Sequence, residues 1–206
     1  MTAAGRWAVI VPLKPAAAGK SRLGAAPSLA RAMGVDTVAA AAATTAVSAV
    51  IVVTADPATA REAGALTGVT VVTEVDAAGL DAAVALGAAA AGADRPRAAL
   101  LGDLPALRPE ELDAALAAAS SVDRAVVADR AGTGSTLITA AAGIPWASAF
   151  GADSLRRHLN RGCVAITAPA SSGLRQDVDT AEDLAAAVAL GVGPRTTAAL
   201  LGSATD

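Results

Sequence analysis

The sequence predicts an α/β fold, in which a mixed, mostly parallel sheet is covered by helices on both faces in three layers. Short runs of Val and Ile alternate along the chain with longer segments rich in Ala and Leu. Several of the short runs, such as residues 7–12, are continuously apolar. Such strands are typical of a parallel sheet buried between two layers of helices. A third observation is that several Ala-rich segments begin with residues that favour helix starts.

The helix starts carry specific signals. Thr180 and Asp183 form a variant of the capping box, and Pro109 suits the first turn of a helix, where acids follow it. We expect one domain over residues 1–206, with its core over about 7–190 and a loosely held tail from Gly193 on. Strands are expected at 7–12, 50–54, 69–73, 98–101, 124–128, 135–139 and 164–166, and helices around 28–45, 57–64, 79–91, 109–119, 154–160 and 180–190.

The composition argues against several classes of function. The net charge is −3 and the chain has no basic tail or stripe, so a nucleic acid partner is not expected. Aromatic residues make up 1% of the chain, which is too few for base-stacking platforms. The single cysteine, Cys163, excludes an intramolecular disulfide and a cysteine metal cluster, and it fits the reducing cytoplasm.

The mean hydropathy of +0.51 raises the question of a membrane segment. The longest uncharged run, residues 38–55, is of marginal length for a span. Its first half is mostly Ala with hydroxyl residues, and its second half contains a β-branched block, so it predicts a helix followed by a buried strand. Residues 1–6 also lack the apolar stretch of a signal peptide. We therefore expect a soluble, cytoplasmic protein without a membrane partner.

Basic residues follow the first predicted strand. Of the 16 Lys and Arg residues only Lys14 and Lys20 are lysines, and Arg22 stands close to them. Ligands of open α/β sheets collect at the carboxyl ends of the strands, and a compact ammonium group suits the oxygens of a polyphosphate. The alternative is a solvated loop that happens to hold both lysines.

Carboxylates follow two other predicted strands. Asp103 comes after residues 98–101 and is preceded by Gly102, and its oxygens are the ligands that Mg²⁺ prefers. Asp177 and Asp179 would point the same way in an extended segment, so one could hold the ion while the other helps to cap the next helix. The alternatives are that Asp103 caps the helix near Pro109, although it stands too early, and that the other two acids are both caps.

Hydroxyl groups mark a third region. The turn at residues 132–136 is rich in Gly, Ser and Thr, and its amides and hydroxyls suit a carboxylate or phosphate, although a plain turn is equally compatible. Ser154 opens a short helix whose amides could bind an anion. His158 lies one turn later, but no oriented acid or nucleophile elbow accompanies a Ser154–His158 pair, so we expect a structural histidine.

Taken together, these motifs resemble one family. The strings are V-P-L-K-x5-K-S-R-L, G-D-L-P-A-L, D-x2-G-T-G-S-T, F-G-x2-S-x3-H and D-V-D-T-x-E-D-L. They are similar to those of the phosphoenolpyruvate/2-phospholactate guanylyltransferases of deazaflavin coenzyme F-420 biosynthesis, over about residues 7–190. The resemblance implies a Rossmann-like fold of the nucleotide-diphospho-sugar-transferase type. It also implies transfer of GMP from GTP to phosphoenolpyruvate or 2-phospholactate, with release of pyrophosphate.

The resemblance also implies a role for each motif. Two positions depart from the family pattern: Ser135 stands where Thr is frequent, and Asp81 stands where Asn is frequent, which leaves the choice of base open. The implied roles are triphosphate contact for Lys14, Lys20 and Arg22, with Lys20 also catalytic; nucleoside contact for Gly79, Leu80 and Asp81; catalytic Mg²⁺ binding for Asp103 and Asp177; and binding of the phosphorylated acid for Ser135, Thr136, Gly151 and Ser154.

Rival interpretations stay open at this point. One is another nucleotidyltransferase of the same fold, using CTP or GTP with a molybdopterin or sugar phosphate. A retaining glycosyltransferase would bind a sugar nucleotide with an Asp-x-Asp motif, but the one at Asp177–Asp179 comes late in the chain. A non-catalytic nucleotide sensor is the third. The choice among phosphoenolpyruvate, 2-phospholactate and 3-phosphoglycerate is open, as are Asp179 as the second metal ligand and a homodimer.

Overall fold

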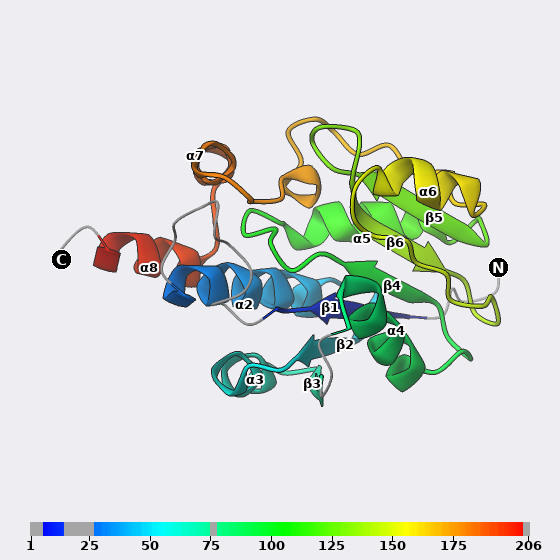
Figure 1. Cartoon of the computed structure of the whole chain (residues 1–206), viewed down its shortest axis with the longest axis horizontal. Helices are drawn as coiled ribbons and strands as arrows, with labels where there is room; N and C mark the ends of the chain where they lie inside the picture. The colour runs from blue at the N-terminus through cyan, green and yellow to red at the C-terminus, as the bar shows by residue number, and fades with distance from the viewer. Residues whose placement is uncertain (1–5, 15–26, 75–77, 204–206) are drawn as a thin grey trace.

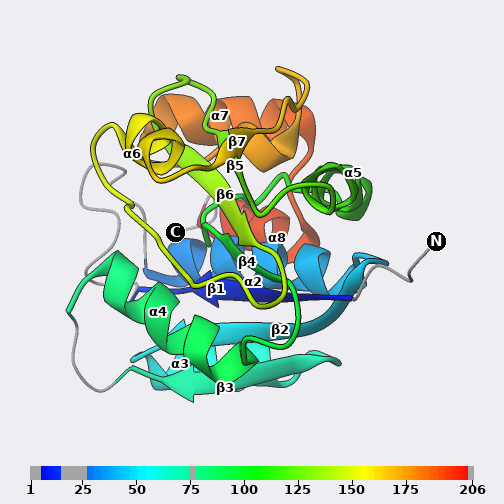
Figure 2. The same cartoon turned by 90° about the vertical axis from the view of Figure 1, so that its right-hand side faces the viewer.

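One mixed sheet organises the chain in a computed structural model that describes residues 6–14, 27–74 and 78–203. Within these residues the strand order is β3-β2-β1-β4-β6-β5-β7, and Figure 2 shows the strands following one another from β3 upward. The strands are β1 (Trp7–Pro12), β2 (Val47–Thr54), β3 (Val69–Thr73), β4 (Arg97–Leu100), β5 (Arg124–Ala128), β6 (Ser135–Ala140) and β7 (Val164–Ala165).

The pairing directions determine which chain ends meet at one edge of the sheet. Strand β1 pairs in parallel with β2 and β4, β2 pairs in parallel with β3, and β5 pairs in parallel with β7. Strand β6 runs antiparallel to both β4 and β5. The beginning of β6 therefore lies beside the carboxyl ends of β4 and β5, as the pairing of Leu100 with Leu137 shows. The predicted mixed, mostly parallel sheet is confirmed.

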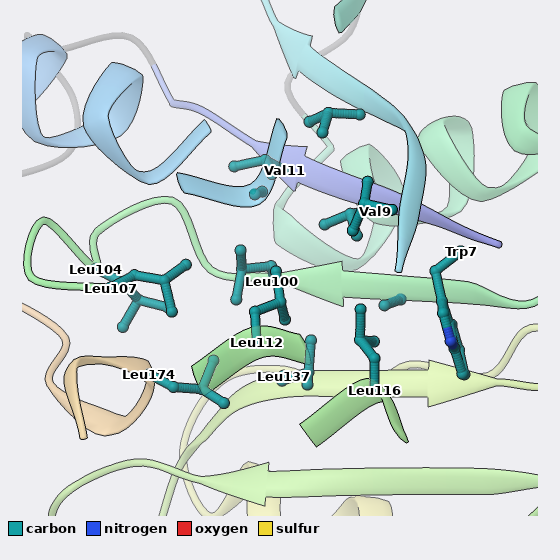
Figure 3. Packing of buried hydrophobic residues seen from close by; sticks show 14 of the residues in the cluster. Trp7, Val9, Val11, Leu100, Leu104, Leu107, Leu112, Leu116, Leu137 and Leu174 are labelled. Atoms are coloured by element: carbon teal, nitrogen blue, oxygen red, sulfur yellow. The ribbon is translucent and has the colours of Figure 1, made fainter. Parts of the chain in front are cut away.

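Helices cover both faces of the sheet (Figure 1). Alternate residues of β1 pack on opposite sides: Val9 and Val11 pack with α2 and α5, whereas Ala8 and Ile10 pack with α4. Figure 3 shows the first of these clusters, with Leu112 and Leu116 of α5 near β4 and β6. The helices are α2 (Pro27–Ala43), α3 (Pro57–Gly64), α4 (Leu80–Ala91), α5 (Pro109–Ala119), α6 (Ser154–Asn160), the short 3₁₀ helix η1 (Gly173–Arg175), α7 (Ala181–Leu190) and α8 (Pro194–Ser203).

The expectation of a loose tail from Gly193 on is wrong. Residues 194–203 form α8, which packs along α2. The buried carboxylate of Asp36 in α2 accepts hydrogen bonds from the amides of Arg195 (3.3 Å) and Thr196 (2.7 Å), and Gly193 donates its amide hydrogen to Pro105 O. A distant acid therefore satisfies the start of α8, a contact that no local pattern predicts.

The other differences from the expected elements are small. The predicted helices at 57–64, 109–119 and 154–160 and the strands at 7–12, 69–73 and 124–128 are confirmed. Strand β2 begins three residues early, at Val47, and η1 was not expected. Throughout the described part of the chain, no helix combines the length and the apolar character that crossing a membrane requires.

Candidate active site

An open pocket of about 350 Å³ lies where β1, β4 and β5 end and β6 begins. Its position agrees with the rule that ligands of α/β sheets bind at the carboxyl ends of the strands. Leu80, at the start of α4, also lines it. Of the residues singled out from the sequence, the lining includes Lys14, Asp103, Asp177, Asp179, Ser135, Gly151 and Ser154. Gly79, Asp81 and Thr136 do not line it, and Lys20 and Arg22 lie outside the described residues.

The backbone brings Asp103 and Asp177 together from distant parts of the chain. Val178, next to Asp177, donates its amide hydrogen to Asp103 O at 3.1 Å. Gly102 permits the close turn after β4, because a Cβ atom there would stand 2.9 Å from Pro12 O. Such a contact with backbone is closer than a side chain tolerates. The two segments that carry the acids are thus held side by side, and both acids line the pocket.

The surroundings of Asp177 disfavour its negative charge. The pKa of Asp177 is raised to about 7, mainly by burial and next by the nearby charge of Asp103, with smaller contributions from Asp129 and Asp179. Two carboxylates that share a partly buried site resist joint ionisation. A divalent cation would offset this repulsion, and oxygen ligands suit Mg²⁺. The donor set at Asp103 and Asp177 therefore fits such an ion.

The helix starts near these acids are capped by other residues. Thr180 caps α7: its Oγ1 accepts from Asp183 N at 3.2 Å, and Asp183 Oδ2 accepts from Thr180 N at 2.9 Å. At α5, Arg108 N donates to Glu111 Oε2 at 3.1 Å. The interpretation of Asp103, Asp177 and Asp179 as helix caps is therefore not needed. Within the described residues no group of three or more His, Cys, Asp or Glu side chains could hold a metal ion, so a cation here would take further ligands from water and substrate.

Asp129 is a pocket residue to which the sequence reasoning assigned no role. Its carboxylate accepts hydrogen bonds from the amides of Thr133 (3.0 Å) and Gly134 (2.8 Å), and its carbonyl accepts from Gly132 N (3.3 Å). These three amides are thus bonded to Asp129, which agrees with the alternative of a plain turn at residues 132–134. The signal was in the sequence, since an Asp followed by a Gly-Thr-Gly run favours such a side-chain-closed turn.

Ser135, Ser154 and His158 form a buried polar group beside the pocket. Ser154 Oγ lies 3.3 Å from Ser135 Oγ, and Ser135 Oγ lies 3.0 Å from His158 Nδ1. His158 Nε2 accepts the amide hydrogen of Ala149 at 2.8 Å. Since Nε2 accepts, the hydrogen of a neutral imidazole is on Nδ1 and is donated to Ser135. Thr136, which follows Ser135, is buried, and its Oγ1 has no hydrogen-bond partner among the described residues.

His158 is neutral in this environment. Its side chain is fully buried, and burial lowers its pKa to about 4. The edge of its ring meets the ring of Phe150, with the centroids 5.1 Å apart. Its serine partner is Ser135 and not Ser154, the residue considered from the sequence. Because Nδ1 donates to this serine, the imidazole does not act as its base, and the structure does not support a serine nucleophile.

Asp81 connects two parts of the pocket wall. Its Oδ1 accepts the amide hydrogen of Phe150 at 3.1 Å, which ties the first turn of α4 to the segment before α6. One carboxylate oxygen predicted to contact a nucleoside is thus engaged with the backbone. Next to this contact, Gly151 has a φ of 108°, which favours glycine, and Arg157 Nη2 donates to Phe150 O at 2.8 Å.

The chain matches the MobA-like NTP transferase domain over residues 17–171. It is 51% identical to the phosphoenolpyruvate guanylyltransferase of Streptomyces coelicolor over 202 residues, which cover 94% of this chain and 95% of that protein. It is 49% identical to the phosphoenolpyruvate guanylyltransferase of Geodermatophilus obscurus over 215 residues, which cover 99% and 98% of the two chains.

Solved structures agree on the fold. A nucleotidyl transferase from Methanothermobacter thermautotroptrophicus superposes with a TM-score of 0.62 at 20% identity, covering 87% of this chain and 94% of that one. A structure described as a nucleotide-diphospho-sugar transferase, from Desulfovibrio desulfuricans G20, also has a TM-score of 0.62, at 18% identity, and covers 87% and 85% of the two chains. The expected nucleotide-diphospho-sugar-transferase-like fold is confirmed.

Proposed function

This chain belongs to the MobA-like NTP transferase family, and we propose that it is a phosphoenolpyruvate guanylyltransferase. In the proposed reaction the GMP group of GTP passes to phosphoenolpyruvate, and pyrophosphate is released. The curated relatives with that name cover nearly the whole chain. The observation that carries the proposal is the pocket itself, which is lined by the carboxylates of Asp103 and Asp177 and by the hydroxyl groups of Ser135 and Ser154.

The proposed chemistry requires no general base. One phosphate oxygen of phosphoenolpyruvate forms a bond to the α-phosphorus of GTP, and the bond from that phosphorus to the oxygen bridging to the β-phosphate breaks. Pyrophosphate leaves with the electron pair. The attacking oxygen is already ionised near neutral pH, so no side chain has to remove a proton. This agrees with a site whose histidine donates a hydrogen bond to Ser135.

The chain's own groups have to bring two anions together. Asp103 and Asp177 would hold Mg²⁺, which when bound offsets the negative charge of the phosphate oxygens. We propose that Lys14, together with Lys20 and Arg22 beyond the described residues, contacts the triphosphate. Ser135, Thr136, Gly151 and Ser154 would receive the acid, and Gly79 and Asp81 would adjoin the nucleoside. Asp81 is proposed to act there by holding the wall in place, given its bond to Phe150.

The test is to identify the product directly. The protein is incubated with Mg²⁺, each of the four nucleoside triphosphates and each of four acceptors: phosphoenolpyruvate, 2-phospholactate, 3-phosphoglycerate and a sugar phosphate. We expect pyrophosphate release with GTP and phosphoenolpyruvate, and a product with the mass of the phosphoenolpyruvate–GMP anhydride. Release with CTP and a sugar phosphate would favour another transferase of this fold. Binding of GTP without release with any acid would indicate a nucleotide sensor.

Several expectations of the sequence stay predictions. A cytoplasmic location rests on the single Cys163. The absence of a nucleic acid partner rests on composition alone, and the place of the product in coenzyme F-420 biosynthesis rests on the resemblance alone. The oligomeric state stays open, and sedimentation analysis of the purified protein tests for a homodimer.

A further inference from the structure

Three polar side chains beside the pocket are buried almost completely. Ser135 and Ser154 are each 2% exposed and His158 is 0% exposed. They come from the first residue of β6 and from the first residue and the last turn of α6, and they are joined in one series of hydrogen bonds that ends at the backbone amide of Ala149. Both serines nevertheless line the pocket. A buried network of this kind determines which hydrogens remain for a ligand.

In the series that joins Ser154, Ser135, His158 and the amide of Ala149, one serine hydroxyl hydrogen has no acceptor among these groups. Ala149 N donates to His158 Nε2, so the imidazole has its hydrogen on Nδ1 and donates to Ser135 Oγ. Ser154 donates to Ser135 Oγ as well. Ser135 Oγ therefore accepts twice, and its own hydrogen is directed elsewhere. If the two serines exchange roles, the remaining hydrogen is on Ser154, which lines the same pocket.

We propose that His158 is a positioning residue for the acid substrate, which holds the Ser135–Ser154 pair as a hydrogen-bond donor to one of its anionic oxygens. The proposal rests on the proposed function, because it assigns the acid of that reaction to this wall. Its basis is the geometry of the series, in which Ser135 Oγ accepts from His158 Nδ1 and one hydroxyl hydrogen of the serine pair stays available to the pocket. A donor hydrogen of this kind suits carboxylate or phosphate oxygens.

Burial keeps the donor arrangement constant. With the pKa of His158 lowered to about 4 by burial, the ring stays neutral across the range in which the enzyme would work. A protonated ring would donate from both nitrogens and lose its bond to Ala149 N. The surrounding charged groups are Asp81, which favours the protonated form, and Arg157 and Arg161, which oppose it. The histidine therefore supplies a fixed donor to Ser135 and not a proton carrier.

The first test reads the tautomer without any substitution. The chain has one histidine, so ¹⁵N-labelled histidine gives one pair of ring nitrogen signals in the NMR spectrum. We expect a protonated Nδ1 and an unprotonated Nε2 in the folded protein from about pH 8 to about pH 6. A hydrogen on Nε2 in place of Nδ1, or a doubly protonated ring in that range, would overturn the proposal.

The second test uses two conservative variants that separate the two nitrogens. In His158→Asn the side-chain amide reaches the position of Nδ1 and can still donate to Ser135, whereas in His158→Gln it reaches the position of Nε2 and can still accept from Ala149. We expect His158→Gln to raise the KM and the calorimetric Kd for phosphoenolpyruvate by roughly 10-fold. His158→Asn should recover most of that loss, and the KM for GTP should stay unchanged in both.

A double-variant cycle distinguishes positioning from general damage to the fold. Ser135→Ala should raise the KM for phosphoenolpyruvate as His158→Gln does, and the combined variant should be no worse than Ser135→Ala alone. Thermal unfolding of each variant shows which ones remain folded at the assay temperature. Equal losses in His158→Asn and His158→Gln, additive losses in the cycle, or a parallel rise in the KM for GTP would each contradict the proposal.

The outcomes also separate this proposal from the proposed function. If the wild-type protein binds phosphoenolpyruvate and His158→Gln weakens that binding, but no pyrophosphate is released, the guanylyltransferase function fails and the role of His158 stands. If turnover is normal and His158→Gln leaves the affinity for the acid unchanged, the role of His158 fails and the function stands.

Discussion

The pocket has an acidic wall, formed by Asp103 and Asp177, and a hydroxyl wall, formed by Ser135 and Ser154 with His158 behind them. Burial changes the pKa of a titratable group in each wall. At the acidic wall, Asp103 and Asp177 lie close together in a partly buried place, and the pKa of Asp177 is raised to about 7. At the hydroxyl wall, Ser135 and His158 satisfy each other, and the pKa of His158 is lowered to about 4. Burial favours the neutral form at both walls, but its consequences differ. At the hydroxyl wall the burial is offset by hydrogen bonds within the chain, whereas at the acidic wall the proposed cation would offset the repulsion between the two carboxylates.

The largest expected effect comes from removing a charge of the acidic wall. Asp103→Asn should lower kcat by roughly 10³-fold or more, because the proposed cation loses a ligand and its several kcal/mol of transition-state stabilisation. Steady-state measurement of pyrophosphate release tests this, with circular dichroism to show that the fold is intact. Asp179→Asn is the matched control at an exposed acid of the same pocket, and its loss should be much smaller. Turnover near wild type in Asp103→Asn would refute the metal assignment.

Stability without a cation should depend on pH through Asp177. Its folded-state pKa of about 7 exceeds the ordinary value of 3.8, so the folded state binds this proton more tightly than the unfolded state. This contribution to stability is fully present below about pH 4 and is lost as the pH rises through about 7. Asp177→Asn should therefore gain roughly 1–3 kcal/mol over the wild type between those limits. Urea unfolding in EDTA across this range measures the gain.

Urea unfolding of the wild type and of Asp177→Asn, repeated with Mg²⁺ in place of EDTA, tests whether a cation binds at the acidic wall. A cation that binds the ionised pair stabilises the wild type more at pH 8 than at pH 5, since protonation of Asp177 competes with binding. The Asp177→Asn variant should respond weakly at both values. An identical response of the two proteins to Mg²⁺ would contradict a shared cation site.

The hydroxyl wall should show the opposite pH dependence. The folded-state pKa of His158, about 4, is below the ordinary value of 6.5. Its contribution to stability is fully present above about pH 6.5 and is lost as the pH falls through about 4. His158→Asn should remove roughly 1–2 kcal/mol of this pH dependence, measured by urea unfolding between those limits. The contributions of Asp177 and His158 to the free energy of unfolding change in opposite directions with pH in the wild type. The His158 contribution is therefore best measured in the Asp177→Asn background. An unchanged slope in His158→Asn would show that another group titrates.

The smallest effect is expected at Asp129, an acid that faces the pocket but belongs to its own turn. Asp129→Asn keeps an oxygen for the amides of Thr133 and Gly134, so it should cost about 1 kcal/mol of stability. Its kcat should stay within about tenfold of wild type, because the carboxylate is engaged with the backbone. A loss as large as that of Asp103→Asn would make Asp129 part of the cation site.

Local signals predicted most of the fold. Helix α7 begins where its capping box stands, and α5 begins at Pro109, because these signals act within one turn of the chain. The same reasoning failed at α8, whose first amides bond to Asp36 in α2, about 160 positions away. At the turn after Asp129 it left a ligand site and a plain turn equally open, and the structure shows the amides of Thr133 and Gly134 bonded to the neighbouring carboxylate.

By itself, the sequence determined that acids, basic residues and hydroxyl groups follow the strands of an α/β sheet, since residue type and spacing carry that information. Tertiary structure alone decided that β6 lies antiparallel between β4 and β5, which brings Ser135 to the edge where Asp103 stands. It also decided that His158 bonds to Ser135 and that Val178 joins the segments of the two acids. Hydrogen bonds between distant residues depend on strand order and direction, and these follow from the packing of the whole core.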